Sequence, residues 1–350
     1  MRVAVNSNLF CFVAMKKILN YLFENKSLSR AEAKRILTSI AMGEFNPTQI
    51  AAFITAYGMR NITVQELQGF RDAMLELCVK IDLSDYSLID LCGTGGDGKD
   101  TFNISTLASF VVAGTGNKVA KHGNYGVSSG CGSSNVMEYL GYQFTGDQDV
   151  LKRSLDEAGI CFIHAPIFNP AMKIVAPIRK ELGVKTFYNM LGPMCNPAEP
   201  KNQLVGVFSL ELARLYAYLY QETDKNYTIL HALDGFDEIS LTCSVKTFNK
   251  KGESLLKVAD FGFEPINEYE IRGGETVASS AKIFVDVLDG KGTDAQTNVV
   301  LCNAAIALQT IDHTKSFADC FYQAEESLMS KKALDSFRKL LNFNEIRINA

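Results

Sequence analysis

Two styles of hydrophobic patterning divide the chain near residue 80. Before that point, apolar residues recur every three or four positions, as in Ile18–Leu22, which is typical of short amphipathic helices. After it, short apolar runs alternate with longer helix-like segments, which is typical of an α/β domain with a largely parallel sheet. We therefore predict an α/β protein with a small helical domain at residues 15–80 and a large α/β domain at residues 81–350.

Capping signals mark the helices of the first region. Ser29 and Glu32 have the spacing of a capping box, and Gly43 suits the end of the helix that begins there. Asn46 followed by Pro47 is typical of the start of the next helix. We interpret the region as a small bundle of short helices joined by short loops.

The second region contains several short apolar runs that we interpret as strands, with helices between them. The candidate strands are Leu88–Gly93, Asn117–Gly123, Gln203–Phe208 and Tyr227–Leu233, and the candidate helices include Ser105–Gly114 and Asn135–Tyr142.

Composition and charge exclude several classes of protein. The 350 residues are 47% hydrophobic and 21% charged, which describes a globular chain rather than a disordered one. The formal net charge of −4 gives no general reason to expect nucleic-acid binding. No apolar segment approaches the ~20 residues that a membrane span needs. The nine cysteines show no C-x-x-C spacing, which favours reduced thiols and a cytoplasmic location.

The first fourteen residues precede the clear helical pattern. Arg2 and the short run Leu9–Ala14 resemble a signal peptide only weakly, because Met15-Lys16-Lys17 follows at once. We expect residues 1–14 to be a dispensable extension, or the result of a start codon assigned too early.

A glycine-rich loop follows the first candidate strand, in the sequence LIDLCGTGGDGKDTFNIST from Leu88 to Thr106. It matches G-x-G-x-x-G, but the expected acidic residue about 20 positions later is missing. It also nearly matches a P-loop, except that Asp100 stands where a magnesium-binding Ser or Thr belongs. A tight strand–helix turn is the alternative that requires no ligand.

Asp97 and Asp100 are out of place in a loop that binds bare phosphate, because their charges repel it. A magnesium ion or a polar sugar between carboxylate and phosphate removes the conflict. Hydroxyl and amide side chains follow where a helix should begin, and a helix N-terminus binds anions. The loop therefore favours a ligand that carries phosphates, hydroxyls and a metal ion together.

A second glycine-rich loop runs from Lys121 to Gly141. Its serines surround glycines before a helix, which is the composition of an anion-binding nest. The serines are Ser128, Ser129, Ser133 and Ser134, around Gly130 and Gly132. His122 ends the preceding strand, where both a structural role and a ligand-binding role are open.

Two further sites have little meaning alone. Arg179 lies on a candidate helix, where a solvated charge is the simple interpretation. Asp237 and Glu238 stand side by side after a strand, as surface carboxylates often do. They gain weight because magnesium on a pyrophosphate requires such oxygen ligands.

Five ordered motifs resemble the successive signatures of the anthranilate phosphoribosyltransferases, and the resemblance extends from about Met15 to near the C-terminus. The motifs are GTGGDGKDTFNIST, KHGNYGVSS, NPAMKIVAPIRKELG, NMLGPMCNP and DGFDEIS, and the later segment AQTNVVLCNAAIAL is similar too.

The resemblance implies a helical domain completed by mid-chain helices near residues 170–195, with the active site in the cleft between the two domains. It implies a homodimer formed largely through the helical domain, and magnesium-dependent use of phosphoribosyl pyrophosphate. The resemblance leaves open whether the protein associates with anthranilate synthase. Neither a nucleic-acid partner nor a membrane is implied.

The resemblance also implies site residues in three groups. Phosphoribosyl pyrophosphate would bind Gly93, Gly95, Gly96, Asp97, Thr101, Asn103, Ser105, Thr106, Lys121 and Ser133. Anthranilate would bind Gly93, His122, Asn124, Arg179 and Gly192, and Mg²⁺ would bind Ser105, Asp237 and Glu238. No residue is assigned as a chemical catalyst, because the anilinic amine is already unprotonated at neutral pH and the tasks are positioning and charge stabilisation.

Four positions depart from the residues that are usual in this family. Tyr125 replaces a basic residue, Asn135 an Asp, Asn169 a His and Lys185 an Arg. The changes at Tyr125 and Asn169 bear on recognition of the aromatic acid, whereas the pyrophosphate motifs are unchanged.

Two rival interpretations remain at this stage. A non-catalytic nucleic-acid-binding relative of the same fold predicts degraded phosphate motifs and a basic surface. A pyrimidine nucleoside phosphorylase predicts different glycine-loop sequences, and phosphorolysis of thymidine would reveal it.

Overall fold

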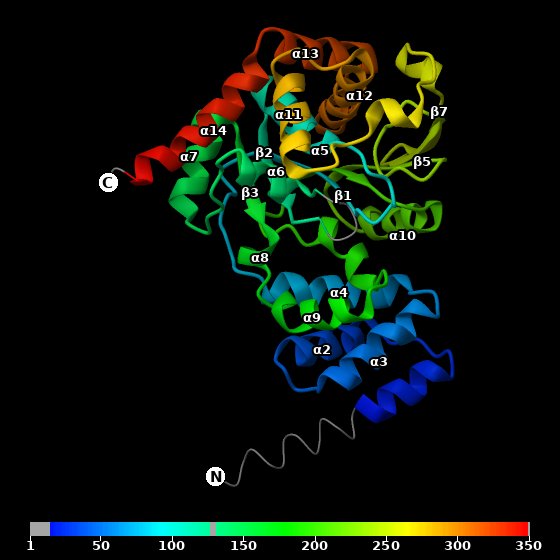
Figure 1. Ribbon diagram of the computed structural model, residues 1–350. Helices are drawn as coiled ribbons and strands as arrows, with labels where there is room; N and C mark the ends of the chain where they lie inside the picture. The colour runs from blue at the N-terminus through cyan, green and yellow to red at the C-terminus, as the bar shows by residue number, and fades with distance from the viewer. Residues whose placement is uncertain (1–14, 127–130, 349–350) are drawn as a thin grey trace. The chain divides into compact units, whose positions relative to one another are not determined.

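The computed structural model describes residues 15–126 and 131–348, which divide into two compact units (Figure 1). One unit contains the described residues up to Lys80 together with Pro166–Pro197. The other contains Ile81–Ala165 and the described residues from Ala198 onward. The expected extension at residues 1–14, and the loop residues Ser128, Ser129 and Gly130, lie outside the described residues.

The first unit is helical, and its helices begin where the capping residues indicate. The side chains of Ser29 and Glu32 form the expected capping box, and Asn46 caps the next helix with Pro47 in its first turn. Gly43, just after the first of these helices, has φ 73°, which favours glycine. The helices are residues 15–23, α2 (Arg30–Ala41), α3 (Pro47–Gly58), α4 (Val64–Leu77), α8 (Ala165–Phe168, which begins at the boundary) and α9 (Met172–Leu182), with 3₁₀ turns η1 (Phe187–Met190) and η2 (Gly192–Met194).

An aromatic cluster forms the core of the helical unit and joins its two segments of chain. Phe53, Tyr57 and Phe70 come from the N-terminal helices, and Phe187 comes from the mid-chain segment. The rings of Phe70 and Phe187 stack with centroids 4.6 Å apart, and Phe53 and Tyr57 meet Phe187 edge-on. Offset and edge-to-face ring pairs of this kind stabilise cores beyond their buried area.

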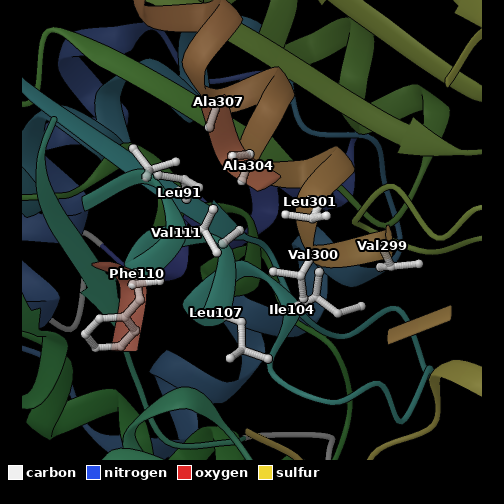
Figure 2. Close-up of a cluster of buried hydrophobic side chains, with 14 of the residues drawn as sticks. Leu91, Ile104, Leu107, Phe110, Val111, Val299, Val300, Leu301, Ala304 and Ala307 are labelled. Carbon is white, nitrogen blue, oxygen red and sulfur yellow. The ribbon is translucent and has the colours of Figure 1, made fainter. Parts of the chain in front are cut away.

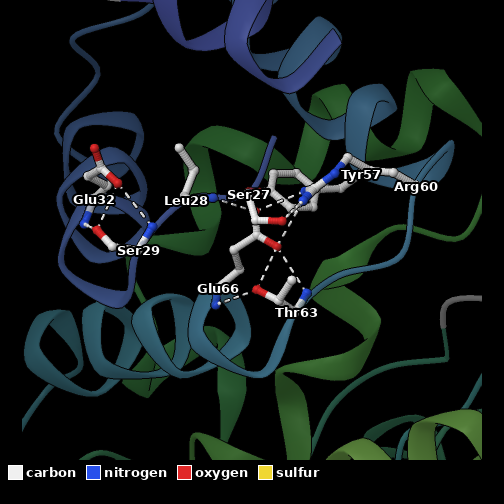
Figure 3. A network of polar contacts seen from close by, with 8 residues as sticks. All are labelled: Ser27, Leu28, Ser29, Glu32, Tyr57, Arg60, Thr63 and Glu66. Atoms are coloured by element: carbon white, nitrogen blue, oxygen red, sulfur yellow. Dashed lines mark hydrogen bonds and ion pairs between the residues drawn. The ribbon is translucent and has the colours of Figure 1, made fainter. Parts of the chain in front are cut away.

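A buried carboxylate holds the loops of the same unit together (Figure 3). Glu66 on α4 is fully buried and accepts hydrogen bonds from the Leu28 amide and the Tyr57 hydroxyl, both at 2.9 Å. Both terminal nitrogens of the Arg60 guanidinium also donate to it, at 2.9 and 3.1 Å. Glu66 also completes a capping box with Thr63, so one side chain both starts α4 and fastens the preceding turns.

The second unit is built on a seven-stranded sheet with the order β3-β2-β1-β4-β5-β6-β7. The first five strands in this order are parallel, and β6 and β7 form an antiparallel hairpin at one edge. The prediction of a mainly parallel sheet is thus confirmed. The strands are β1 (Leu88–Gly93), β2 (Lys118–Gly123), β3 (Ile160–His164), β4 (Asn202–Gly206), β5 (Asn226–Ala232), β6 (Val245–Asn249) and β7 (Gly252–Leu256).

Helices connect the strands and complete the unit after the hairpin. They are α5 (Ile104–Gly114), α6 (Ser133–Tyr139), α7 (Gln148–Ala158), α10 (Leu210–Gln221), α11 (Val277–Leu288), α12 (Asp294–Ile311), α13 (Phe317–Met329) and α14 (Lys332–Ile348), with 3₁₀ turns η3 (Val258–Phe261) and η4 (Glu268–Ile271). No helix within the described ranges is both long and apolar enough to cross a membrane.

The core of this unit lies where α12 packs on α5 and on the central strands (Figure 2). Val300 and Leu301 of α12 and Leu107 and Val111 of α5 are buried side chains at this contact, beside Leu91 of β1. Both helices are apolar on nearly every face, because both are covered on nearly every side. Their packing fixes the start of α5 and one polar residue of α12, described below.

Candidate active site

The site forms where the strand order reverses direction. β1 lies between β2 and β4, and Gly93 at the end of β1 is in register with Gly206 at the end of β4. Open α/β sheets bind ligands at the carboxyl ends of the strands at such a reversal. The glycine-rich loop follows β1 at this point. Gly95, Gly96 and Gly98 have φ of 61°, 72° and 77°, a conformation that residues with a Cβ rarely adopt.

Two glycines make room for the Asp237 carboxylate. A Cβ on Gly93 would overlap the Asp237 side chain, and a Cβ on Gly206 would overlap its backbone. The Gly95 amide donates to Asp237 Oδ2 over 2.8 Å. A Cβ on Gly95 or Gly98, in contrast, would meet nothing within 4 Å. The loop is therefore closed around Asp237 on one side and open on the other, above Gly95.

Three carboxylates gather beneath the loop. Burial, together with the charge of Asp97, raises the pKa of Asp237 to about 7. Burial and the charge of Asp237 raise the pKa of Glu238 well above its ordinary value, and burial raises the pKa of Asp97. Each ionised group makes ionisation of its neighbours costly, so a bound cation is what would relieve the cluster.

The start of α5 approaches the same carboxylates. The Ser105 amide donates to Glu238 Oε1 over 3.0 Å, and the Thr101 hydroxyl donates to Glu238 Oε2 over 3.4 Å. Asn103 is the N-cap residue of α5, and its Nδ2 lies 3.4 Å from the Cys131 carbonyl oxygen. Thr106 Oγ1 is buried without a hydrogen-bond partner among the described residues. A buried polar atom without a partner requires an explanation, and a bound ligand would supply one.

Lys121 brings a buried positive charge to this end of the sheet. It is 3% exposed, and its Nζ donates to the Leu91 carbonyl over 2.6 Å and lies 3.5 Å from Ser105 Oγ. Its charge works to lower the pKa of Glu238, although burial and the neighbouring carboxylates outweigh it. The predicted phosphate residues Ser105 and Lys121 are thus brought together, beside the predicted metal ligand Glu238.

The predicted metal ligands fit Mg²⁺ carried by a phosphate. Carboxylate and hydroxyl oxygens are the donors that Mg²⁺ prefers, and it keeps several sites for phosphate or water oxygens. No three His, Cys, Asp or Glu side chains among the described residues converge as a ready-made metal site. Asp237, Glu238 and Ser105 would thus supply only part of a coordination shell, and a pyrophosphate would supply the rest.

The second glycine-rich loop is fastened mainly by Asn135. Its Oδ1 accepts from the amides of Gly126 and Gly132 at 3.1 and 3.0 Å. The Asn124 carbonyl accepts from the Ser134 amide and the Ser133 hydroxyl at 3.2 and 3.3 Å, so Asn124 and Ser133 are neighbours. His122 is 7% exposed, and its amide donates to Asp90 Oδ1 over 3.0 Å.

Tyr125, where a basic residue is usual, contacts two neighbouring side chains. Its hydroxyl donates to Glu138 Oε1 over 2.6 Å, and the edge of its ring meets His164, with centroids 5.1 Å apart. His164 in turn stacks on Phe144 and lies 3.0 Å from the Ser134 hydroxyl.

Arg179 and Gly192 lie in the helical unit. Arg179 Nη2 donates to Asn189 Oδ1 over 3.3 Å, and the guanidinium lies 5.4 Å from the centroid of the Tyr188 ring. Burial lowers the pKa of Arg179. Arg179 Nε and the Tyr188 hydroxyl are both buried without hydrogen-bond partners among the described residues. Arg179 is therefore not the solvated helix charge of the simple interpretation, and it has a donor to spare for a carboxylate.

Comparison with known proteins decides which family has this arrangement. Residues 16–78 match the model described as "Glycosyl transferase family, helical bundle domain", and residues 85–334 match "Glycosyl transferase family, a/b domain". The anthranilate phosphoribosyltransferase of Christiangramia forsetii is 60% identical over 95% of this chain and 100% of its own length. That of Flavobacterium psychrophilum is 62% identical over 93% of this chain and 98% of its own length.

The chain belongs to the anthranilate phosphoribosyltransferase family.

Solved structures of this family have the same fold. The Thermus thermophilus enzyme superposes with a TM-score of 0.87 at 30% identity, over 93% of this chain and 99% of its own. The Saccharomyces cerevisiae enzyme, in complex with PRPP and Mg, superposes with a TM-score of 0.88 at 25% identity, over 95% of this chain and 98% of its own. The prediction of family and fold from the five motifs is confirmed.

Asn303 of α12 is a residue that sequence analysis did not single out. It is 4% exposed, its Nδ2 donates to the Ile239 carbonyl over 2.9 Å, and its Oδ1 accepts from the Ile239 amide over 3.1 Å. It thus holds both backbone groups of the residue after Glu238, and it borders a small pocket that Gly93, Asp237 and Glu238 also line. The sequence signal that could have pointed to Asn303 is its polar amide within the otherwise apolar run of α12.

Proposed function

We propose that this protein transfers the phosphoribosyl group of phosphoribosyl pyrophosphate to the amine of anthranilate. The bond between the ribose anomeric carbon and pyrophosphate breaks, and a bond from that carbon to the anthranilate nitrogen forms. Pyrophosphate leaves with the bonding electrons, and the nitrogen releases a proton. The observation that carries the proposal is the carboxylate cluster beside Lys121 and the start of α5, in a chain whose relatives carry this name.

The site residues divide the work by position. The residues suited to the phosphates and ribose hydroxyls are the open backbone of Gly95, the neighbouring Gly96, Lys121, the start of α5 with Asn103 and Thr106, and Ser133. Asp237, Glu238 and Ser105 would hold Mg²⁺, which when bound supplies positive charge to the leaving pyrophosphate. Asp97 accepts from the Lys99 amide over 3.1 Å, which holds its carboxylate against the loop, and we assign this carboxylate to the ribose or the metal ion.

Arg179 is suited to the anthranilate carboxylate, because its planar guanidinium can donate two parallel hydrogen bonds. We assign Gly93, His122, Asn124 and Gly192 to anthranilate binding as well. Orientation of the amine against the anomeric carbon supplies much of the rate, since bringing two reactants into line replaces an encounter in solution. No residue needs to remove a proton before attack.

Loss of anthranilate fluorescence on addition of phosphoribosyl pyrophosphate and Mg²⁺ tests the function directly. We expect a decrease that requires all three components and stoichiometric release of pyrophosphate. A chain that instead splits thymidine with phosphate would be a nucleoside phosphorylase. One that binds nucleic acid and shows neither reaction would be a non-catalytic relative, although the intact phosphate motifs and the net charge of −4 disfavour it.

We further propose that the protein is a cytoplasmic homodimer that associates largely through the helical unit. The support is the exposure of large apolar side chains on that unit: Phe23 is 62% exposed, Met42 64% and Met59 86%. All cysteines in the described part of the chain are free thiols, as in a reducing compartment. Light scattering after size exclusion would give twice the chain mass of 38.5 kDa. Association with anthranilate synthase stays a prediction.

A further inference from the structure

A segment outside the five motifs forms a second wall against the glycine-rich loop. This segment, Glu268–Gly274, begins at η4 and is anchored by Ile271, which is fully buried. Lys99 Nζ lies 2.8 Å from Glu268 Oε2, and the Gly273 amide donates to the Asp100 carbonyl over 2.6 Å. A Cβ on Gly273 would lie 2.9 Å from the Thr101 carbonyl oxygen, so the two backbones approach as closely as glycine permits.

Thr101 and Arg272 face each other across this contact. They are partners in an isolated antiparallel bridge, and the bond from Gly273 to Asp100 flanks that pair. They are therefore a non-hydrogen-bonded pair, in which side chains project to the same face with Cβ atoms about 4.5–5.5 Å apart. The Thr101 hydroxyl donates to Glu238, so the Arg272 side chain leaves the backbone on the same face of this bridge as Glu238.

The Arg272 guanidinium is available for a ligand. Arg272 is exposed, and its side chain has no hydrogen bond or ion pair with any of residues 15–126 or 131–342. The other two cations of this region are already engaged. Lys99 pairs with Glu268 and lies over the Phe236 ring, and Lys121 donates to the Leu91 carbonyl. In the segment Glu268–Gly274, the Arg272 guanidinium is thus free to bind a substrate that carries several negative charges.

We propose that Arg272 binds the pyrophosphate leaving group of phosphoribosyl pyrophosphate, on the side where Glu238 would hold the metal ion; this inference rests on the function proposed above. The long Arg272 side chain can extend past Thr101 toward Glu238. Its planar guanidinium can donate two parallel hydrogen bonds to two phosphate oxygens. Negative charge develops on pyrophosphate as its bond to the ribose breaks, so a cation placed there stabilises the transition state more than the bound substrate. The ribose 5-phosphate end of the substrate does not need Arg272.

The test compares Arg272→Ala, Arg272→Gln and Arg272→Lys with Arg153→Ala, an exposed arginine on α7, as the matched control. We expect Arg272→Ala and Arg272→Gln to lower kcat/KM for phosphoribosyl pyrophosphate about 10- to 100-fold, as loss of a charge-assisted hydrogen bond implies. The Lys variant should keep part of the activity, since it retains the charge without the fork. KM for anthranilate and the melting temperature should stay at wild-type values.

Product inhibition locates the contact. The inhibition constant of Mg²⁺-pyrophosphate should rise at least tenfold in Arg272→Ala, whereas that of ribose 5-phosphate should not change. Equal increases for both inhibitors would overturn the assignment to the leaving group. Arg272 variants indistinguishable from Arg153→Ala would overturn it entirely. If the wild-type protein is inactive with all three components present, the proposed function fails rather than this inference.

Discussion

The Asn303 side chain forms hydrogen bonds with both backbone groups of Ile239. It donates to the Ile239 carbonyl over 2.9 Å and accepts from the Ile239 amide over 3.1 Å. Because Ile239 follows Glu238 directly, helix α12 sets the position of the two carboxylates that would hold the metal ion. A third hydrogen bond, from Asn303 Nδ2 to the Val299 carbonyl over 2.8 Å, fixes the amide against its own helix. Metal binding at Asp237 and Glu238, as proposed, would thus depend on a residue that is not itself a proposed metal ligand.

Replacement of Asn303 by Ala should therefore raise the Mg²⁺ concentration for half-maximal activity several-fold, with KM for anthranilate unchanged. Stability should also fall by about 1–3 kcal/mol, because buried backbone groups lose their partners. Gln309→Ala is the control, since Gln309 lies on the same helix and donates to a backbone carbonyl at a different place. An Asn303→Ala protein with normal Mg²⁺ dependence would show that Asn303 serves stability alone.

Neutralising the carboxylate pair should abolish turnover without unfolding the protein. In Asp237→Asn/Glu238→Gln, the bond from the Gly95 amide can persist to an amide oxygen, and repulsion between buried charges is removed. We expect at least a 10³-fold loss of rate, since removal of a metal clamp costs several kcal/mol of transition-state stabilisation, and a melting temperature no lower than that of the wild type. Asp234→Asn, in the same loop, is the control for rate. Retained turnover in the double variant would refute the metal assignment.

Arg179→Ala should raise KM for anthranilate by about 10- to 100-fold, because the substrate carboxylate loses a charge-assisted partner. KM for phosphoribosyl pyrophosphate should change by less than twofold. Steady-state kinetics with each substrate varied in turn give both constants. Parallel increases in the two would indicate that Arg179 supports the helical unit in general, through Asn189 and Tyr188.

Gly95→Ala should lose affinity for phosphoribosyl pyrophosphate, because its Cβ would project into the open space above the loop. The left-handed backbone at φ 61° adds a folding cost of about 1 kcal/mol. Gly116→Ala carries a similar backbone cost, at φ 93° with nothing within 4 Å of the added Cβ, and it follows the far end of α5. We expect both variants to melt slightly early, but only Gly95→Ala to lose the thermal shift that substrate and Mg²⁺ produce. Equal shifts in both would assign Gly95 to the turn alone.

Glu66 should control the acid stability of the helical unit. Burial works to raise the pKa of Glu66, but hydrogen bonds from Arg60, Thr63, Leu28 and Tyr57 outweigh it, and the pKa is lowered. Its stabilising contribution is therefore complete above the ordinary pKa near 4.5, and it is lost as pH falls below that value toward the folded pKa. Glu66→Ala should cost about 3–5 kcal/mol near neutral pH, because the largely buried Arg60 guanidinium is left without its partner.

The natural control for Glu66 is Glu32, which completes the same kind of capping box on α2 but is exposed (Figure 3). Glu32→Ala should cost about 1 kcal/mol. Chemical denaturation of both variants between pH 3 and 7 measures the difference. Similar losses at Glu32 and Glu66 would mean that the cap, and not the buried ion pair, stabilises this unit.

The sequence predicted best the elements whose signals are local. The caps at Ser29 and Asn46 are readable because the side chain and the amide it binds lie three residues apart. The strand and glycine loop at Leu88–Gly98 could be predicted because an apolar run is followed by several glycines. These glycines adopt positive φ values that other residues rarely adopt. The order and spacing of the five motifs then identified the family.

What the sequence did not predict depends on distant pairings. The strands β6 and β7 were not among the predicted strands, because neither contains a continuous apolar run and β7 is largely exposed at the edge of the sheet. Asn303 is one amide in an apolar helix, and its partner Ile239 is 64 positions away. Arg272 acquires meaning only when the bridge to Thr101 is known, because the two are far apart in the chain.

The two-part helical unit also constrains how the chain is made. On the ribosome, the first 80 residues emerge long before Phe187, the ring that stacks on Phe70 and completes the aromatic cluster. The aromatic core of the N-terminal helices therefore stays partly uncovered until the segment through Pro197 has been synthesised. A gene fragment that stops near Lys80 would produce an incomplete unit, whereas one that fuses Pro166–Pro197 to it by a linker would supply the missing core. The helical unit is thus not encoded by one continuous stretch of the gene.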